Sequence, residues 1–336
     1  MSYYTIVSTY PKEGSQNIGD FLIEKSTKEA ILKVKGDDVS FESIWREDEW
    51  GNVKETILNS KAIIFACLAI RRDMQKTYPY LSKIIENNIP FGVIAAGTAL
   101  SPKPQGALNF DDITPESLAI LKKVIQNAVL FTTRGLLTQA FCNYHNLDNA
   151  KFSGDIAFTD FRYKETTFDL KGSIRKIAIS DPHYALEFLE SFRYLIEKSK
   201  QTFPNAEINI IQHGKNEIIA NWCNNNGVKL IPAYLNKETG LDCYSDFDMH
   251  IGYRIHGHVS ALTRRKISYL LEQDGRGCDY GLTFQKNITV PSFVEESKIV
   301  SNYSLKSFIK NKLLNKPLIK YQTIRLAPLS AVDKLF

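Results

Sequence analysis

Short runs of Val, Ile, Leu and Phe recur along this chain and alternate with segments of helical periodicity. Strands that are buried on both faces of a parallel sheet are continuously apolar in this way, whereas half-exposed strands alternate apolar and polar residues. In the first half such runs cover residues 3–8, 62–68, 91–96 and 128–133. The rhythm predicts a doubly wound α/β unit in which helices connect parallel strands.

Helix signals stand between these runs and support the same interpretation. Thr114-Pro115-Glu116 supplies a hydroxyl cap, a proline for the first turn and an acid for the positive helix end, so we expect a helix from Thr114 to about residue 126. The second half repeats the rhythm, with predicted helices at 183–198 and 216–225 and predicted strands at 175–180, 206–212, 228–232, 249–252 and 267–271. The sequence therefore predicts two Rossmann-like doubly wound domains that face each other across a cleft.

Chain length and polarity place the domain boundaries. A chain of 336 residues exceeds what one hydrophobic core usually supports. Residues 160–173 are polar and follow neither periodicity, so we place the linker there and expect domains at 1–165 and 166–300. Residues 301–336 form a basic C-terminal segment with an amphipathic helical pattern. Two interpretations of it stay open: a helix that packs on a domain with its lysines in solvent, or one that docks on anionic lipid at the inner face of the membrane.

Charge and composition exclude few classes of function. The net charge of +5 suits anionic small molecules, an anionic membrane or nucleic acid. Aromatic residues do not interleave with the basic tail in a stacking pattern, so we expect no nucleic-acid partner. The N-terminus does not resemble a signal peptide, and the longest apolar run, 62–70, is too short to span a bilayer, so we expect a cytoplasmic protein. The five cysteines are dispersed without metal-ligand spacing, which indicates reduced thiols and no metal site.

The segment after the apolar run 249–252 is the most informative about chemistry, because Arg254 and His256 follow the run and a helical pattern begins there. Ligands of open α/β sheets bind beyond the carboxyl ends of the strands. A helix N-terminus adds free backbone NH groups and a positive dipole, so this place suits an anion. Arginine grips carboxylate or phosphate with two hydrogen bonds, and histidine transfers protons near neutral pH. We therefore expect Arg254 and His256 in the active site, and interpret His250 and His258 as structural.

Other polar residues also follow predicted strands and are candidates for the same cleft. Asp274 and Arg276 come after the run 267–271, and Arg134 comes after the run 128–133. Between the first strand and the first helix, Gly19 permits close backbone approach, and Asn17 or Asp20 can cap the helix or bind hydroxyls. Two further candidates at strand ends of the second half are His183 and His213.

Together these elements resemble those of the polysaccharide pyruvyl transferases, a family of two-domain enzymes with a fold like that of GT-B glycosyltransferases. Asn17-Ile18-Gly19-Asp20 is similar to the family's Asn-x-Gly-Asp element, and Thr133-Arg134 to its Val-Arg-Asp element. Gly154-Asp155-Ile156-Ala157 is similar to a Pro-Asp-Pro-Ala element, and Arg254-Ile255-His256-Gly257 to the Arg-x-His-Gly signature. Asp274-Gly275-Arg276 closes a series that runs in the family's order.

Two departures from the family pattern bear on the acceptor side of the site. Many members carry a Gly-Gly-Gly loop after the second strand, where this chain has Phe65-Ala66-Cys67-Leu68-Ala69-Ile70-Arg71-Arg72-Asp73. The acid that follows the arginine of the Val-Arg-Asp element is replaced by Gly135.

The resemblance implies transfer of pyruvate from phosphoenolpyruvate to two hydroxyls of one sugar of a surface polysaccharide or its precursor, with release of phosphate. The donor carries a carboxylate and a phosphate, so the implied donor-binding residues are Arg254, Arg134, Arg276 and Gly257. His256 is the implied general acid/base. Supporting or acceptor roles fall to Asn17, Gly19, Asp20 and Asp274. The implied acceptor is a glycan or lipid-linked sugar, and no cofactor is needed beyond phosphoenolpyruvate as co-substrate.

Two other functions fit the same architecture, because a fold does not fix a function. A GT-B-type glycosyltransferase would place a nucleotide-sugar in this cleft and would need a pocket for the base and ribose. Phosphoenolpyruvate instead requires a compact cluster of arginines. A non-catalytic glycan- or nucleotide-binding protein is the third interpretation. The missing Gly-rich loop is its one indication, and the presence of both Arg254 and His256 argues against it.

Overall fold

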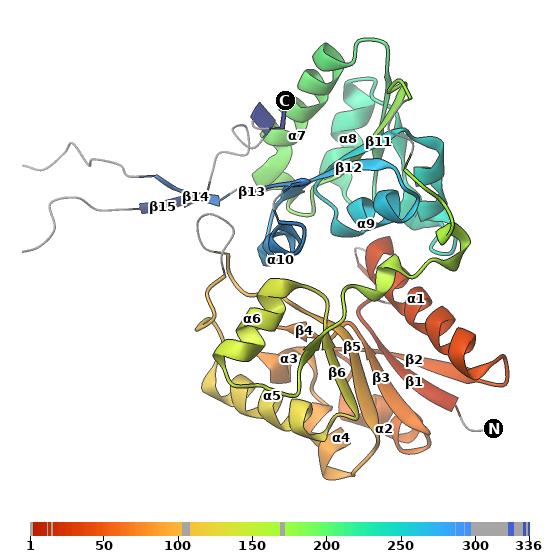
Figure 1. Cartoon of the computed structure of the whole chain (residues 1–336), viewed down its shortest axis with the longest axis vertical. Coiled ribbons are helices and arrows are strands. Elements are labelled where there is room, and N and C mark those ends of the chain that lie inside the picture. Colours follow the sequence, from red (N-terminus) through yellow and green to blue (C-terminus); the bar gives the residue numbers. More distant parts are fainter. Residues whose placement is uncertain are drawn as a thin grey trace, which may run out of the picture.

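The computed structural model describes residues 3–291 except 12, 15, 103–107, 169–171 and 286, and then residues 293–296, 322–325, 332–333 and 335–336. Within these residues the chain forms two parallel sheets with helices between the strands, one in each half (Figure 1). The predicted α/β fold class is confirmed.

The first sheet has the strand order β2-β1-β3-β5-β6-β7, with β4 paired to β5. Its strands are β1 (Tyr3–Ser8), β2 (Ser40–Trp45), β3 (Ala62–Ala66), β4 (Ala69–Ile70), β5 (Phe91–Thr98), β6 (Leu130–Thr133) and β7 (Lys151–Phe152). Its helices are α1 (Ile18–Lys35), α2 (Trp50–Leu58), α3 (Met74–Thr77), α4 (Leu81–Glu86), α5 (Pro115–Asn127) and α6 (Leu136–Tyr144). Thr114 caps α5 as predicted, since its hydroxyl accepts from the Ser117 NH at 3.2 Å.

The second sheet has the order β10-β9-β8-β11-β12-β13. Its strands are β8 (Lys176–Ser180), β9 (Glu207–Ile211), β10 (Leu230–Ile231), β11 (Met249–Gly252), β12 (Ile267–Glu272) and β13 (Thr289–Pro291). Its α-helices are α7 (Ala185–Thr202), α8 (Glu217–Asn225), α9 (Ile255–Thr263) and α10 (Gly275–Thr283), and 3-10 turns lie at η4 (Ala233–Leu235) and η5 (Gly240–Asp246). The connection between the sheets contains η2 (Ile156–Phe158) and η3 (Phe161–Tyr163), and the predicted boundary at 165/166 falls within it.

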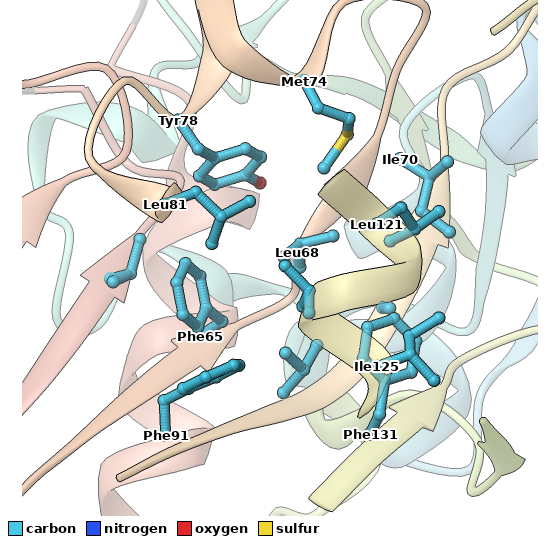
Figure 2. Close-up of a cluster of buried hydrophobic side chains, with 14 of the residues drawn as sticks. Phe65, Leu68, Ile70, Met74, Tyr78, Leu81, Phe91, Leu121, Ile125 and Phe131 are labelled. Carbon is cyan, nitrogen blue, oxygen red and sulfur yellow. The ribbon is translucent and has the colours of Figure 1, made fainter. Parts of the chain in front are cut away.

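Each domain has its own core. In the first domain, helices α3 to α5 pack on the strands through a cluster that includes Phe65, Leu68, Tyr78, Phe91 and Leu121, all of them buried (Figure 2). In the second domain, α7 and α8 cover one face of the sheet through residues such as Phe188 and Ile219. The continuous apolar runs are therefore buried as predicted.

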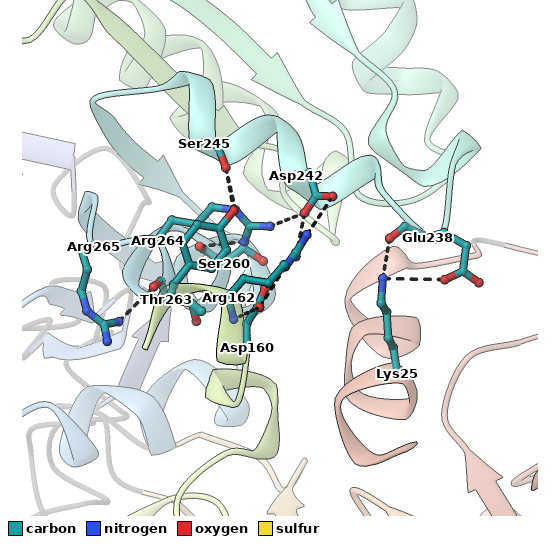
Figure 3. Close-up of polar contacts among 11 residues, drawn as sticks. Lys25, Asp160, Arg162, Glu238, Asp242, Ser245, Ser260, Thr263, Arg264 and Arg265 are labelled. Carbon is teal, nitrogen blue, oxygen red and sulfur yellow. Dashed lines mark hydrogen bonds and ion pairs between the residues drawn. The ribbon is translucent and has the colours of Figure 1, made fainter. Parts of the chain in front are cut away.

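The two domains are joined by apolar and ionic contacts. Ile18, at the start of α1, is completely buried in a cluster with Ile211 and Tyr244 of the second domain. Further along α1, Lys25 donates to the backbone oxygen of Glu238 at 2.9 Å (Figure 3). In the connection, Arg162 pairs with Asp242 at 3.0 Å. The contacts of Ile18 and Lys25 hold α1 against the second domain, and that of Arg162 holds the connection there.

The C-terminal segment differs from the expectation of a helix in the part that is described. Residues Gln322–Arg325 form β15, which pairs antiparallel with β14 (Phe293–Glu296). Strand pairing replaces the helical pattern there because a neighbouring strand satisfies the backbone of β15. Val332 is buried in the core of the second domain. The remainder of the predicted basic helix, at 301–321 and 326–331, lies outside the described residues. Among the described helices, none is both long and apolar enough to cross a membrane.

Candidate active site

A cavity lies where the strand order reverses in both sheets. In the first sheet β2 and β3 flank β1, and in the second β9 and β11 flank β8. Connections leave such a point in opposite directions and open a crevice at the carboxyl ends of the strands. Thr9 and Cys67 from the first domain, and His183 and Arg254 from the second, line this one cavity. The site is therefore built from both domains.

The cavity has a narrow inner compartment and a wider outer one. Their volumes are about 50 Å³ and about 640 Å³, and Asn17, Asp20, Arg71 and Arg276 line both. A single water needs roughly 10–15 Å³ of such space, so the inner compartment suits a small ligand and the outer a larger one.

Arg254 forms part of the inner wall and is fixed by Asp181. It stands at the N-cap of α9, and its Nε and Nη2 donate to the two carboxylate oxygens of Asp181 at 2.9 and 2.6 Å. Its Nη1 lies 3.3 Å from Nδ1 of His183. Burial and the nearby Arg254 lower the pKa of His183 to about 4, so this histidine is neutral near pH 7. The predicted arginine thus reaches the cavity with part of its charge already compensated.

His256 lies in the first turn of α9, against the first turn of α1 from the other domain. A Cβ on Gly19 would lie only 2.5 Å from Nδ1 of His256, so the glycine is what allows the two to meet. The Nε2 atom of His256 is buried without a hydrogen-bond partner among the described residues. Burial lowers the pKa of His256, although the carboxylates of Asp155 and Asp20 act in the opposite direction. A neutral imidazole with an unpartnered nitrogen beside the cavity has the capacity to accept a proton.

Arg134 follows β6 and is buried in the wall of the inner compartment. Its Nη1 donates to Sγ of Cys67 at 3.4 Å and lies 3.9 Å from Oδ2 of Asp155. Its Nε is buried without a partner among the described residues. Burial acts against its charge, but the side chains around it, Asp155 included, raise the pKa of Arg134 above the ordinary value. It therefore offers a permanent charge and a free donor.

Arg276 and Asp274 form a second fixed pair. Asp274 caps α10 by accepting the backbone NH of Arg276 at 3.0 Å, and it also accepts from the Nε and Nη2 atoms of Arg276 at 3.1 and 2.6 Å. The carboxylate of Asp274 raises the pKa of Arg276, and the guanidinium lowers that of Asp274 against the effect of burial. Both residues line the outer compartment.

The other predicted residues divide into Asn17 and Asp20, which line the cavity, and the glycines Gly19 and Gly257, which do not. Asn17 caps α1 by accepting from the Gly19 NH at 3.2 Å, and its amide donates to Asp20 at 3.0 Å. Gly257 is absent from the described lining, and a Cβ there would lie 2.6 Å from the Tyr244 hydroxyl. Packing of α9 thus explains a glycine at this place in the motif, and the expected role of Gly257 in donor binding stays a prediction.

The four other histidines of the second domain also separate into two groups. His183 and His213 line the inner compartment, as their position at strand ends indicated. His250 and His258 are completely buried and share the hydroxyl of Ser268 at 2.7 Å each, which agrees with a structural role.

Two cavity arginines were not predicted. Arg71 follows β4, lines both compartments, and has a buried Nε without a hydrogen-bond partner among the described residues. Burial and the charge of Arg46, which also lines both compartments, lower the pKa of Arg71. The sequence signal was present, since Arg71 ends an apolar run, but that run was interpreted as one strand. Five arginines therefore border the described cavity: Arg46, Arg71, Arg134, Arg254 and Arg276.

Asp155, from the element similar to Pro-Asp-Pro-Ala, caps η2 and accepts a hydrogen bond from the hydroxyl of Tyr280 on α10. It thus connects the two domains beside Arg134. Among the described residues, no group of three or more His, Cys, Asp or Glu side chains is placed to hold a metal ion.

Two facing doubly wound domains with a cavity between them define a protein of the GT-B architectural class. S. aureus MnaA, solved with UDP, has a TM-score of 0.51 and 9% identity over 99% of this chain and 94% of that chain. The UDP-GlcNAc 2-epimerase of Neisseria meningitidis, solved with UDP-GlcNAc, has a TM-score of 0.51 and 10% identity over 100% of this chain and 98% of that chain. At this identity the likeness shows the fold alone. No curated protein sequence matches the chain.

Within this class, the family profile described as Polysaccharide pyruvyl transferase matches residues 17–266. The match begins at Asn17 and includes Arg134, Asp155, Arg254 and His256. The chain belongs to the polysaccharide pyruvyl transferase family, so the resemblance drawn from its motifs is confirmed.

Proposed function

We propose that this protein transfers pyruvate from phosphoenolpyruvate onto two hydroxyls of one sugar in a surface polysaccharide or its precursor. The observation that carries the proposal is the cluster of five arginines around a cavity that is also lined by His256, whose Nε2 atom has no partner in the described part of the chain. A small anion with a carboxylate and a phosphate is the ligand that such a cluster stabilises best.

The donor would occupy the inner compartment, beside Arg71 and Arg134, whose Nε atoms have no partner among the described residues. Arg254 and Arg276 would add charge from positions that Asp181 and Asp274 fix. A sugar acceptor would occupy the outer compartment, where Asn17, Asp20 and Asp274 offer hydrogen bonds to hydroxyls.

The reaction balances without a redox partner. One sugar hydroxyl bonds to the central carbon of the donor, the methylene takes up one proton and becomes a methyl group, and the bond to the phosphate oxygen breaks. The second hydroxyl then closes the ketal. The two hydroxyls release two protons, of which one goes to the methylene and one leaves with phosphate. Because its lowered pKa keeps His256 neutral, it would act first as a base on a hydroxyl and then return the proton as an acid.

The test is calorimetric and thermal-shift titration with phosphoenolpyruvate beside UDP-GlcNAc and other nucleotide-sugars. A ligand that binds only the folded state raises its melting temperature. We expect stabilisation by phosphoenolpyruvate that is lost in Arg71→Ala and Arg254→Ala, and donor binding without turnover in His256→Ala. Arg72→Ala is the matched control, because the neighbouring Arg72 is 75% exposed and pairs with Asp112 outside the cavity. A response to nucleotide-sugars alone would replace this proposal with a glycosyltransferase, and an active His256→Ala enzyme would refute the role of that histidine.

The cellular setting is part of the same proposal. The acceptor would be a glycan or a lipid-linked sugar in the cytoplasm, and the basic residues between 301 and 325 would bring the enzyme to an anionic membrane surface.

A further inference from the structure

The N-terminus of α6 is capped by the other domain. The first backbone NH groups of a helix have no partners inside the helix, and the N-cap residue of α6 is Gly135, which has no side chain to offer them. The Leu136 NH donates to Oγ1 of Thr283 at 3.0 Å. The NH groups of Leu137 and Thr138 donate to Oδ1 of Asp279 at 2.8 and 3.2 Å. Thr283 and Asp279 both belong to α10, which lies beside α6 across the domain boundary (Figure 1).

Asp279 is held mainly by groups of the first domain. Its side chain is completely buried, and its Oδ2 accepts the hydroxyl of Thr138 at 2.6 Å. A buried carboxylate requires such hydrogen bonds to offset its lost hydration. Burial raises the pKa of Asp279, and the bonds from Thr138 together with the charge of Arg134 act against that rise. Separation of the domains would leave both the carboxylate and the end of α6 without these partners.

Gly135 and Asp279 are complementary in space. A Cβ on Gly135 would lie 2.1 Å from Oδ1 of Asp279. The backbone of Gly135 is extended, with φ of −140°, so space rather than backbone conformation requires a glycine there. The sequence lacks an acid directly after Arg134, and the carboxylate that occupies this place comes from α10.

We propose that Asp279 is a positioning residue, which caps α6 across the domain boundary and thereby couples Arg134 to the relative placement of the two domains. Arg134 is separated from the capped end of α6 by one residue, and its guanidinium lies 5.8 Å from the ring centre of Tyr280, the neighbour of Asp279 in α10. A shift of α10 would therefore disturb the backbone of Arg134 through the cap of α6 and its guanidinium through Tyr280. The effect on ligand binding rests on the proposed function, whereas the effect on unfolding does not.

Differential scanning calorimetry and phosphoenolpyruvate titration of the whole chain test this coupling. We expect one cooperative transition for the wild type and two for Asp279→Ala, because the domains lose a shared cap. Binding of phosphoenolpyruvate is expected to weaken about tenfold in the same variant, as for a typical coupling between two states of a protein. Asp279→Asn retains an oxygen acceptor for the two NH groups, so it should keep a single transition and near wild-type binding.

Two variants separate positioning from simple helix capping. Asn216→Ala removes the cap of α8, a helix of the same 9 residues as α6, whose cap accepts from Ile219 inside one domain. This control should lower the melting temperature without dividing the transition or weakening binding. Gly135→Asp/Asp279→Ala moves the carboxylate to the N-cap of α6 itself, in space that the truncation frees. This double variant should restore the stability of the first domain, since Asp is a favourable N-cap. It should restore neither the single unfolding transition nor the binding of phosphoenolpyruvate.

A single transition for Asp279→Ala, or recovery of both cooperativity and binding by the double variant, would overturn the proposal. If Asp279→Ala does not fold, the double variant and Asp279→Asn provide the same comparison. Absence of phosphoenolpyruvate binding by the wild type would refute the donor assignment, and the calorimetric comparison would still decide the role of Asp279.

Discussion

Asp181 fixes Arg254 in the cavity wall, and its removal tests whether the buried pair holds the site together. The carboxylate is completely buried and accepts from two nitrogens of Arg254, at 2.9 and 2.6 Å. It also accepts the backbone NH of His213 at 3.0 Å, so it connects the ends of three strands. Asp181→Ala would leave a guanidinium charge whose side chain is only 7% exposed without this partner.

The expected loss is large. Removal of one partner from a buried ion pair costs about 3–5 kcal/mol of the free energy of unfolding. In domains of 150–250 residues, a loss of 1 kcal/mol lowers the melting temperature by about 2–4 °C. The melting temperature of Asp181→Ala should therefore fall by about 10 °C. The double variant Asp181→Ala/Arg254→Ala should be more stable than Asp181→Ala alone, because it removes the uncompensated charge as well.

Urea denaturation and thermal unfolding of these variants provide the measurement. Glu207→Ala is the control, because Glu207 pairs with Lys229 at 2.8 Å where both side chains face solvent. Such a pair contributes little, so this control should unfold nearly as the wild type does. If Asp181→Ala loses no more stability than Glu207→Ala, the reasoning about the buried pair is wrong.

Acid pH should destabilise the protein, because burial lowers the pKa of His183 to about 4 and that of His258 to about 3, whereas an unfolded histidine titrates near ~6.5. At pH values under about 6.5 the unfolded chain therefore binds more protons than the folded chain, and the melting temperature should decrease as the pH is lowered. A melting temperature that stays constant down to about pH 5 would contradict this. Gly19→Ala should lower turnover about a hundredfold, since its Cβ would lie 2.5 Å from Nδ1 of His256 and displace the ring. Gly51→Ala in α2 is the control, because a Cβ there meets nothing within 4 Å, and equal turnover of the two glycine variants would count against the steric argument.

The fold could be predicted because its buried strands carry their own signal. β1 and β11 begin and end where the apolar runs do, at Tyr3–Ser8 and Met249–Gly252. β2 was missed because it lies at the sheet edge and Ile44 is its only buried residue, so neither a continuous nor an alternating apolar pattern marks it. β7 is only two residues long in the structure, which is below the length at which periodicity can be recognised. β10 is equally short, but it lies inside the predicted strand at 228–232.

Residues of the candidate site could be predicted only where they directly follow a strand that the sequence reveals. Arg254 and Asp274 follow recognisable strands, so topology alone brings them to the cleft. Arg71 was missed because the run 62–70 contains two strands, which are divided at Cys67 with a left-handed φ of 65°. A non-glycine residue in that conformation leaves no mark in the apolar pattern. Asp279 lies in the middle of α10, and its role depends on a contact between domains that no local pattern encodes.

The arginines of the cavity differ in what they offer an anion. Arg254 and Arg276 each direct two nitrogens at a carboxylate, so their positions are fixed and part of their charge is compensated. Arg71 and Arg134 each keep a buried Nε without a partner among the described residues. An unpartnered buried donor costs free energy until a ligand satisfies it, so an anion gains most from this second pair. The first pair sets the shape of the wall, and the residues with unpartnered donors belong to the first domain, on the loops after β4 and β6. The signature around Arg254 therefore identifies the cavity, while under the proposed function the tightest contacts to the donor are expected from the other domain.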